Sequence, residues 1–134
     1  MKASVKWVGE ELFMGTSDSG HTIVLDANGG SLAPSPLENV LISLGACSSV
    51  DVVSILEKTR QDVTGCRVDI LATRVDPVPR LFSDIHLHFV VTGNDVASKH
   101  VDRAVSLSAD KYCSVALMLN KCVKITHDFE ILSA

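Results

Sequence analysis

Four cysteines are the residues of this 134-residue chain that are best suited to redox or nucleophilic chemistry. No two of them are separated by two residues, so their spacing excludes a zinc ribbon and a thioredoxin-type Cys-x-x-Cys pair. The N-terminus is charged and alternating, without the apolar segment of a secretory signal, so we expect a cytoplasmic protein with reduced thiols. Cys66 and Cys122 each begin a predicted strand, where a free cysteine commonly packs as a small hydrophobe.

The histidines give a weaker indication of chemistry. His86 and His88 lie two residues apart on one face of a predicted strand, a spacing that two ligands of a metal ion can have. No third ligand is spaced to join them, and a polar strand face explains the pair equally well. We therefore expect no metal site and no organic cofactor. The remaining histidines are isolated in the sequence: His21, His100 and His127.

Composition restricts the class of protein. A chain of this length with 46% hydrophobic and 21% charged residues fits one compact domain spanning residues 1–134. Twelve lysines and arginines stand against sixteen aspartates and glutamates, which leaves a net charge of −4 and no broad cationic surface. Aromatic residues make up only 4%, too few for a platform on which bases stack. We expect no nucleic-acid partner.

Hydrophobic periodicity predicts an α+β fold with a largely antiparallel sheet. Ser35 is placed to cap a long helix that begins at Pro36 and ends near residue 60, after Lys58 in its last turn. Asp110 is placed to cap a short helix late in the chain. The predicted strands cover residues 2–8, 11–16, 21–26, 66–76, 82–92 and 122–132, the loop after the third covers 26–31, and the later helices cover 96–109 and 111–120.

The long helix is apolar on most of its sides. Glu38, Ser48 and Asp51 interrupt the apolar run, which argues against a membrane span. A helix that is apolar all round must be buried all round, and one sheet covers only one side of it. We therefore predict a homodimer with this helix at or near the interface. Asp51 lies four residues after Cys47 on the same helix face, where it could accept a hydrogen bond or face a polar cavity.

Two strings around cysteines carry a family resemblance. Ser35-Pro36-Leu37-Glu38 leads through Leu44-Gly45-Ala46-Cys47 into the long helix, and Ala109-Asp110-Lys111-Tyr112-Cys113-Ser114-Val115 stands late in the chain. Both strings, and the order of elements along the whole chain, resemble the OsmC/Ohr family.

The resemblance implies an intertwined homodimer whose interface holds two sites, each with a peroxidatic and a resolving cysteine. By motif, Cys47 matches the peroxidatic position and Cys113 the resolving one. The implied activity is a thiol-dependent reduction of organic or hydrogen peroxide in oxidative-stress defence, in which a cellular dithiol restores the cysteine pair.

The chain departs from the family pattern around Cys47. The family's peroxidases activate this cysteine with an N-terminal arginine, yet the first arginine here is Arg60, and Leu37 stands where the family has a glutamate. Glu38 is adjacent, but nine residues along a helix place it on the side opposite Cys47. Ser114 and Ala116 replace a proline and a serine after the second cysteine.

Two alternatives therefore stay open. If Asp110 caps the short helix, Cys113 sits at its third position, becomes the more acidic thiol, and the roles of the two cysteines invert. The second alternative is a catalytically weak dimer that is redox-sensitive or binds a small apolar ligand in a pocket beside Cys47. The residues expected to line that pocket are aliphatic: Val40, Leu44, Val50, Leu117 and Met118.

Overall fold

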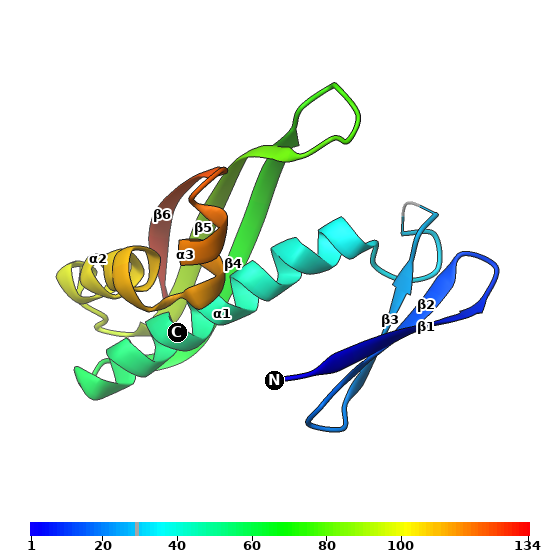
Figure 1. Ribbon diagram of the computed structural model, residues 1–134. Helices are drawn as coiled ribbons and strands as arrows, with labels where there is room; N and C mark the ends of the chain where they lie inside the picture. Colours follow the sequence, from blue (N-terminus) through cyan, green and yellow to red (C-terminus); the bar gives the residue numbers. More distant parts are fainter. Residues whose placement is uncertain (29) are drawn as a thin grey trace. The chain divides into compact units, whose positions relative to one another are not determined.

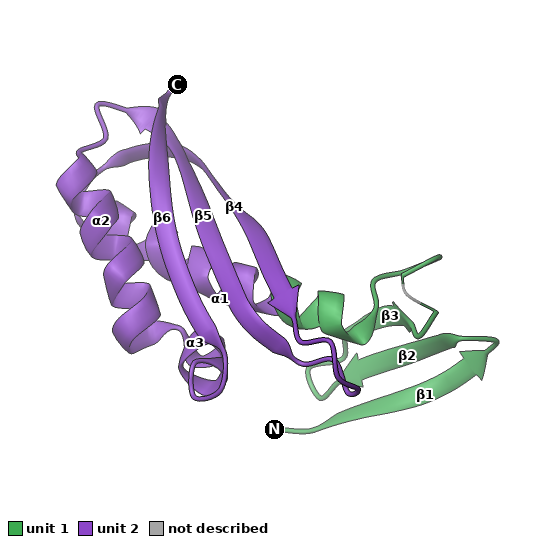
Figure 2. Cartoon of the chain, turned by 90° about the horizontal axis from the view of Figure 1, so that it is seen from above, with its two compact units in different colours: residues 1–42 green, residues 43–134 purple. Residues whose placement is uncertain are grey.

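The computed structural model describes residues 1–28 and 30–134, and these form two compact units, 1–42 and 43–134 (Figure 1, Figure 2). The expectation of a single domain spanning residues 1–134 stays a prediction. Gly29, within the predicted loop 26–31, lies outside the described residues. The first unit holds β1 (Ala3–Gly9), β2 (Leu12–Ser17), β3 (Thr22–Asp26) and the start of α1 (Pro36–Lys58). The second holds the rest of α1, β4 (Asp62–Arg74), β5 (Phe82–Asn94), α2 (Ser98–Leu107), α3 (Ser114–Leu119) and β6 (Lys124–Ser133).

The first unit is an antiparallel meander in the order β1-β2-β3, as the alternation of its residues predicts. Gly9 has a φ of +112°, which suits a residue without a side chain at the tight turn between β1 and β2. The buried carboxylate of Asp26 ends β3 and accepts hydrogen bonds from the backbone N–H groups of Asn28 and Leu32, both at 2.7 Å. These bonds fix the start of the loop that leads to α1.

Helix α1 begins where the capping signals predict. The hydroxyl of Ser35 accepts a hydrogen bond from the backbone N–H of Glu38 at 3.2 Å, and the Glu38 carboxylate accepts one from the backbone N–H of Ser35 at 3.0 Å. This reciprocal pair is a capping box, and it satisfies two N–H groups that would otherwise lack a partner. Lys58 lies in the last turn, as predicted.

Within the second unit only one stripe of α1 is buried, not most of its circumference. Leu44, Ser48, Val52 and Leu56 recur every four residues and are at most 2% exposed, whereas Val50 is 68% exposed. Gly45 is buried beside this stripe, where an added methyl group would lie 2.7 Å from Cδ1 of Ile70 on β4. The second unit therefore covers α1 on one side and leaves its other sides without the burial that their apolar residues predict.

The sheet of the second unit has the order β4-β5-β6. Strands β4 and β5 are antiparallel, but β5 and β6 are parallel, so the prediction of a largely antiparallel sheet is wrong for this pair. The reason lies in the connection: β5 and β6 are joined through α2 and α3, a crossover long enough to return the chain in the same direction. Figure 2 shows these helices and α1 on one side of the sheet.

Strand β5 confirms the predicted alternation. Its apolar residues face the helices and are at most 3% exposed: Ile85, Leu87, Phe89 and Val91. His86 and His88 face the other side, where Asp128 of β6 accepts from both rings, from His86 Nε2 at 3.0 Å and from His88 Nδ1 at 2.6 Å. Among the described residues no group of histidine, cysteine and acidic side chains could hold a metal ion. A polar strand face is thus the observed role of this pair.

The segment after α2 was predicted to be a short helix capped by Asp110, and the structure differs. The helix ends at Leu107 and continues as a π-helical turn, Ser108–Tyr112, in which the Cys113 N–H donates to the Ser108 carbonyl at 2.8 Å. Asp110 lies inside this turn and caps nothing. Cys113 is itself the N-cap of α3, because its sulfur accepts from the backbone N–H of Ala116. A side-chain acceptor three residues ahead of a free N–H decides where the helix begins.

By length and composition, α1 is the one helix of the described chain that could cross a membrane. Of its most apolar stretch, 28% is buried. Core helices of soluble proteins meet the same criterion, and the buried stripe of α1 contains a serine that is hydrogen-bonded to another element of the second unit.

Close packing at Gly93 predicts a position-specific loss of stability. A methyl group there would collide with the Asp62 carbonyl and lie 2.5 Å from Cγ2 of Val96. We expect Gly93→Ala to lower the free energy of unfolding by about 2 kcal/mol, because backbone cannot move aside as a side chain can. The control is Gly65→Ala on the paired strand, where the new methyl would meet Thr92 at 3.6 Å. Urea unfolding of both variants measures the difference, and equal losses would contradict the close-packing argument.

The histidine face predicts a pH-dependent contribution to stability. Hydrogen bonds to Asp128 and then Glu130 raise the pKa of His88 from its ordinary value of 6.5. The imidazolium therefore stabilises the fold fully below pH 6.5, and this contribution is lost as the pH rises through the folded-state pKa. Asp128→Asn should lower the His88 pKa in an NMR titration. Asp84→Asn, on β5 with His88, should leave that pKa unchanged. An unaltered His88 titration in Asp128→Asn would refute the assignment.

Candidate functional site

Cys47 lies on α1 at the edge of its buried stripe and is half-buried. The next residue, Ser48, is on the stripe itself and is 2% exposed. Helix geometry therefore directs the serine into the second unit and leaves the cysteine partly open to solvent.

Cys113 is held at the junction between the π-helical turn and α3, and it is fully buried. Its sulfur accepts two hydrogen bonds, from the Ser48 hydroxyl at 3.3 Å and from the Ala116 N–H at 3.4 Å. The first of these joins residues 65 positions apart in the chain. It fixes the second cysteine against the helix that carries the first.

The structure brings the two candidate cysteines together. Burial is the main cause that raises the pKa of the Cys113 thiol; the hydrogen bonds from Ser48 and Ala116 act in the opposite direction. Cys47 raises the pKa of Cys113 further, through a hydrogen bond and through charge repulsion. Because thiols exert such effects only at short range, Cys47 and Cys113 lie close together.

The expectation that Cys113 is made acidic by a helix start is wrong. It rests on Asp110 as the cap, whereas the cap is Cys113 and its environment is buried. An apolar environment disfavours a thiolate more than two hydrogen bonds favour it, so the pKa is raised rather than lowered. No lysine or arginine appears among the groups that act on this thiol.

Asp51 accepts a hydrogen bond, which is one of the two roles that its spacing from Cys47 allows. The Ser108 hydroxyl donates to Asp51 Oδ2 at 3.0 Å, and the Ser48 carbonyl lies 3.4 Å from the same hydroxyl. Ser108 is 1% exposed and stands at the start of the π-helical turn. This bond attaches the π-helical turn to α1.

The other two cysteines lie outside this site. Cys66 is half-buried on β4, and burial raises its pKa. Its groove is open and is also lined by Val50 and Val53. Cys122 is exposed and donates to the Leu119 carbonyl at 3.7 Å, so the expectation that it packs as a small hydrophobe is wrong. It lies in the turn before β6 rather than in the strand, since β6 begins at Lys124.

Glu38 has a structural role in the described chain. Its carboxylate is engaged with Ser35 in the capping box, and the hydrogen bonds from the Ser35 backbone and side chain lower its pKa. Glu38, which is adjacent to the position where the family has a glutamate, therefore stabilises the N-terminus of α1.

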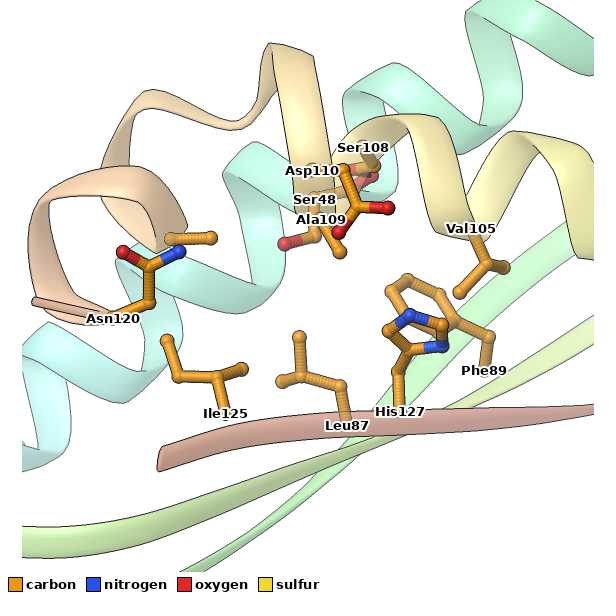
Figure 3. A pocket seen from close by; sticks show the side chains of 11 residues that line it. Ser48, Leu87, Phe89, Val105, Ser108, Ala109, Asp110, Asn120, Ile125 and His127 are labelled. Atoms are coloured by element: carbon orange, nitrogen blue, oxygen red, sulfur yellow. Dashed lines mark hydrogen bonds between the residues drawn. The ribbon is translucent and has the colours of Figure 1, made fainter. Parts of the chain in front are cut away.

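A cavity of about 110 Å³ lies between the helices and the sheet of the second unit (Figure 3). It is not lined by the predicted residues: Leu44 belongs to the buried core, and Val50 and Met118 are exposed. Ser48 and Ser108 were not predicted as residues of a site. For Ser48 the sequence does hold a signal, because this serine stands at four-residue spacing among the apolar residues of the long helix. The lining comprises Ser48, Leu87, Phe89, Val105, Ser108, Ala109, Asp110, Ala116, Asn120, Ile125 and His127.

Comparisons with known proteins agree with this fold. The protein YhfA of Escherichia coli K12 is 56% identical over 134 residues, the full length of both chains. A hypothetical protein from Aquifex aeolicus is 28% identical, with a TM-score of 0.89 over 99% of this chain and 96% of that one. The organic hydroperoxide resistance protein OhrB of Bacillus subtilis shares the fold at 15% identity, with a TM-score of 0.63 and 96% of each chain covered.

The family model for OsmC-like protein matches residues 28–128, which include both cysteines of the site. Since this match covers well over half of the chain, and a curated relative is similar from end to end, the chain belongs to the OsmC-like protein family.

Proposed function

We propose that this chain is a thiol-dependent peroxidase that reduces organic or hydrogen peroxide through Cys47 and Cys113, in defence against oxidative stress. The observation that carries the proposal is the pairing of a half-buried thiol with a fully buried one in a single site. Family membership and the fold shared with an organic hydroperoxide resistance protein support it.

The reaction has three steps. The Cys47 thiolate attacks one oxygen of the peroxide; the O–O bond breaks, Cys47 becomes a sulfenic acid, and the other oxygen leaves with a proton as an alcohol or water. Cys113 then attacks the Cys47 sulfur, which forms a disulfide and releases water. An external dithiol reduces this disulfide by exchange and is itself oxidised. None of these steps needs a metal or an organic cofactor.

Accessibility supports the assignment of the two roles. A peroxide can approach Cys47, whereas Cys113 is fully buried and cannot meet it first. The Cys113 sulfur already accepts from Ser48 and Ala116, so its own S–H is left to donate toward Cys47. A raised pKa keeps that proton on Cys113, so this thiol stays protonated until Cys47 has been oxidised. The inverted assignment has no such support.

A slower, redox-sensing role is the second candidate. It is favoured by one specific observation: among the described residues, the groups that act on the Cys113 thiol include no lysine or arginine. A thiol without a positive neighbour is a weak nucleophile at neutral pH. Such a protein would form the same disulfide, but far more slowly.

We propose that the working unit is a cytoplasmic homodimer. The apolar surface of α1 that the single chain leaves open includes Ile42, 53% exposed, and Val50, 68% exposed. Helices with apolar residues all round are stable in water only when another surface covers them. A second copy supplies that cover.

The order of reaction is testable by trapping the sulfenic acid. In Cys113→Ser the disulfide cannot form, so dimedone added with cumene hydroperoxide should label Cys47, as located by peptide mass spectrometry. In Cys47→Ser we expect no label on Cys113, because the peroxide does not reach it. Cys66→Ser and Cys122→Ser serve as matched controls and should behave like the native chain. Labelling of Cys113 in Cys47→Ser would show that the roles are inverted.

The dimer is testable by sedimentation. We expect the native chain to sediment at twice its mass of 14.4 kDa. Val50→Asp places a charge on the apolar face of α1 and should weaken association by about two orders of magnitude, ~3 kcal/mol. Val78→Asp, at a site that is 89% exposed in the connection between β4 and β5, is the control and should remain dimeric. A monomeric native chain would refute the dimer.

A further inference from the structure

Neither Cys47 nor Cys113 lines the cavity shown in Figure 3, and the reaction proposed above does not use it. At about 110 Å³ it has room for roughly four water molecules at about 30 Å³ each, which suits a short organic molecule. Asp110, Ser48 and Ser108 line its helix side, and Leu87, Ile125 and His127 rise from the sheet. One wall is therefore polar, and most of the opposite wall is apolar.

The two buried hydroxyl groups that line the cavity each donate a hydrogen bond to another residue. Ser48 donates to the Cys113 sulfur at 3.3 Å, and Ser108 donates to Asp51 at 3.0 Å. A hydroxyl whose proton is engaged offers only lone pairs to another partner. Both serines are at most 2% exposed, so the lone pairs they offer in this wall are shielded from bulk water.

The remaining polar groups strengthen the acceptor character of the cavity. Asp110 is the exposed acidic residue of the lining, and its side chain accepts hydrogen bonds and donates none when ionised. Asn120 and His127 can each accept as well as donate. A ligand that matches this wall must bring hydrogen-bond donors and positive charge, and an anion would meet acceptors of its own sign.

The wall is formed by the π-helical turn. Because the Cys113 N–H bonds to the Ser108 carbonyl five residues back, the turn is wider than an α-helical one. It contributes Ser108, Ala109 and Asp110 to the lining together. Such turns are rare and occur frequently at functional sites.

We propose that this cavity binds a small primary alkylammonium ion, with the ammonium group at Asp110 and the two serine oxygens and the alkyl chain against Leu87 and Ile125. We infer also that Ser48 transmits occupancy of the cavity to Cys113.

Occupancy of the cavity can affect Cys113 because the same residues line the cavity and contact the Cys113 sulfur. Ser48 and Ala116 are the two donors to the Cys113 sulfur, and both also line the cavity. An ammonium ion that donates to the Ser48 oxygen polarises that hydroxyl and strengthens its hydrogen bond to Cys113. The positive charge nearby also favours the thiolate form of Cys113.

Binding is tested on the reduced full-length chain by NMR titration with n-butylammonium chloride, with sodium butyrate and 1-butanol as matched probes. We expect saturable shifts at residues of the cavity with the amine, weaker ones with the alcohol and none with butyrate. Asp110→Asn should weaken amine binding about tenfold. Asp102→Asn, on the exposed side of α2, should not change it. Absence of saturable shifts, equal binding of butyrate, or equal behaviour of the two variants would overturn the proposal.

Transmission to Cys113 is tested in a variant that keeps this cysteine alone, with Cys47, Cys66 and Cys122 replaced by serine. Ultraviolet thiolate absorbance followed against pH should move to lower pH with n-butylammonium and not with 1-butanol. Adding Ser48→Ala should remove this displacement. A titration unaffected by the amine would overturn the transmission. Neither experiment uses a peroxide, so its failure is distinct from failure of the proposed peroxidase activity.

Discussion

The second unit depends on the burial of one stripe of α1. Leu44, Ser48, Val52 and Leu56 lie one above another at four-residue spacing, and Gly45 beside them lets the helix approach β4 closely. Three of the four residues of the stripe contribute apolar surface. The fourth, Ser48, needs a hydrogen-bond partner once it is buried, and it finds one in Cys113. The same packing thus stabilises the unit and determines where the second thiol lies.

The position of Cys113 shows burial and hydrogen bonding in opposition. Its sulfur caps α3 and accepts from Ser48, which favours the thiolate, but full burial has the larger effect and keeps the pKa raised. A protonated, inaccessible thiol beside a half-exposed one is suited to act second. In the proposed reaction Cys113 therefore remains a thiol until Cys47 is oxidised and then attacks the Cys47 sulfur.

Local signals predicted much of the fold. The capping residues Ser35 and Pro36 located the start of α1, and the alternation along β5 separated the core residues from His86 and His88. Errors arose where residue types alone did not reveal which hydrogen bond would form. Asp110 resembles a cap in the sequence, but the Ser108 carbonyl and the Cys113 sulfur formed the turn and the cap instead. The cavity could not be predicted because its lining joins six segments spread over residues 48–127 of the sequence: α1, α2, the π-helical turn, α3, β5 and β6.

If Cys47 and Cys113 act as one redox pair, rapid oxidation of the reduced native chain should join them. The protein is mixed with one equivalent of cumene hydroperoxide, quenched at successive times and digested without reduction for peptide mass spectrometry. We expect a Cys47–Cys113 disulfide that forms stoichiometrically within seconds and is absent from Cys47→Ser. Thiols that stay reduced for minutes, or a disulfide that involves Cys66 or Cys122 instead, would refute the pairing.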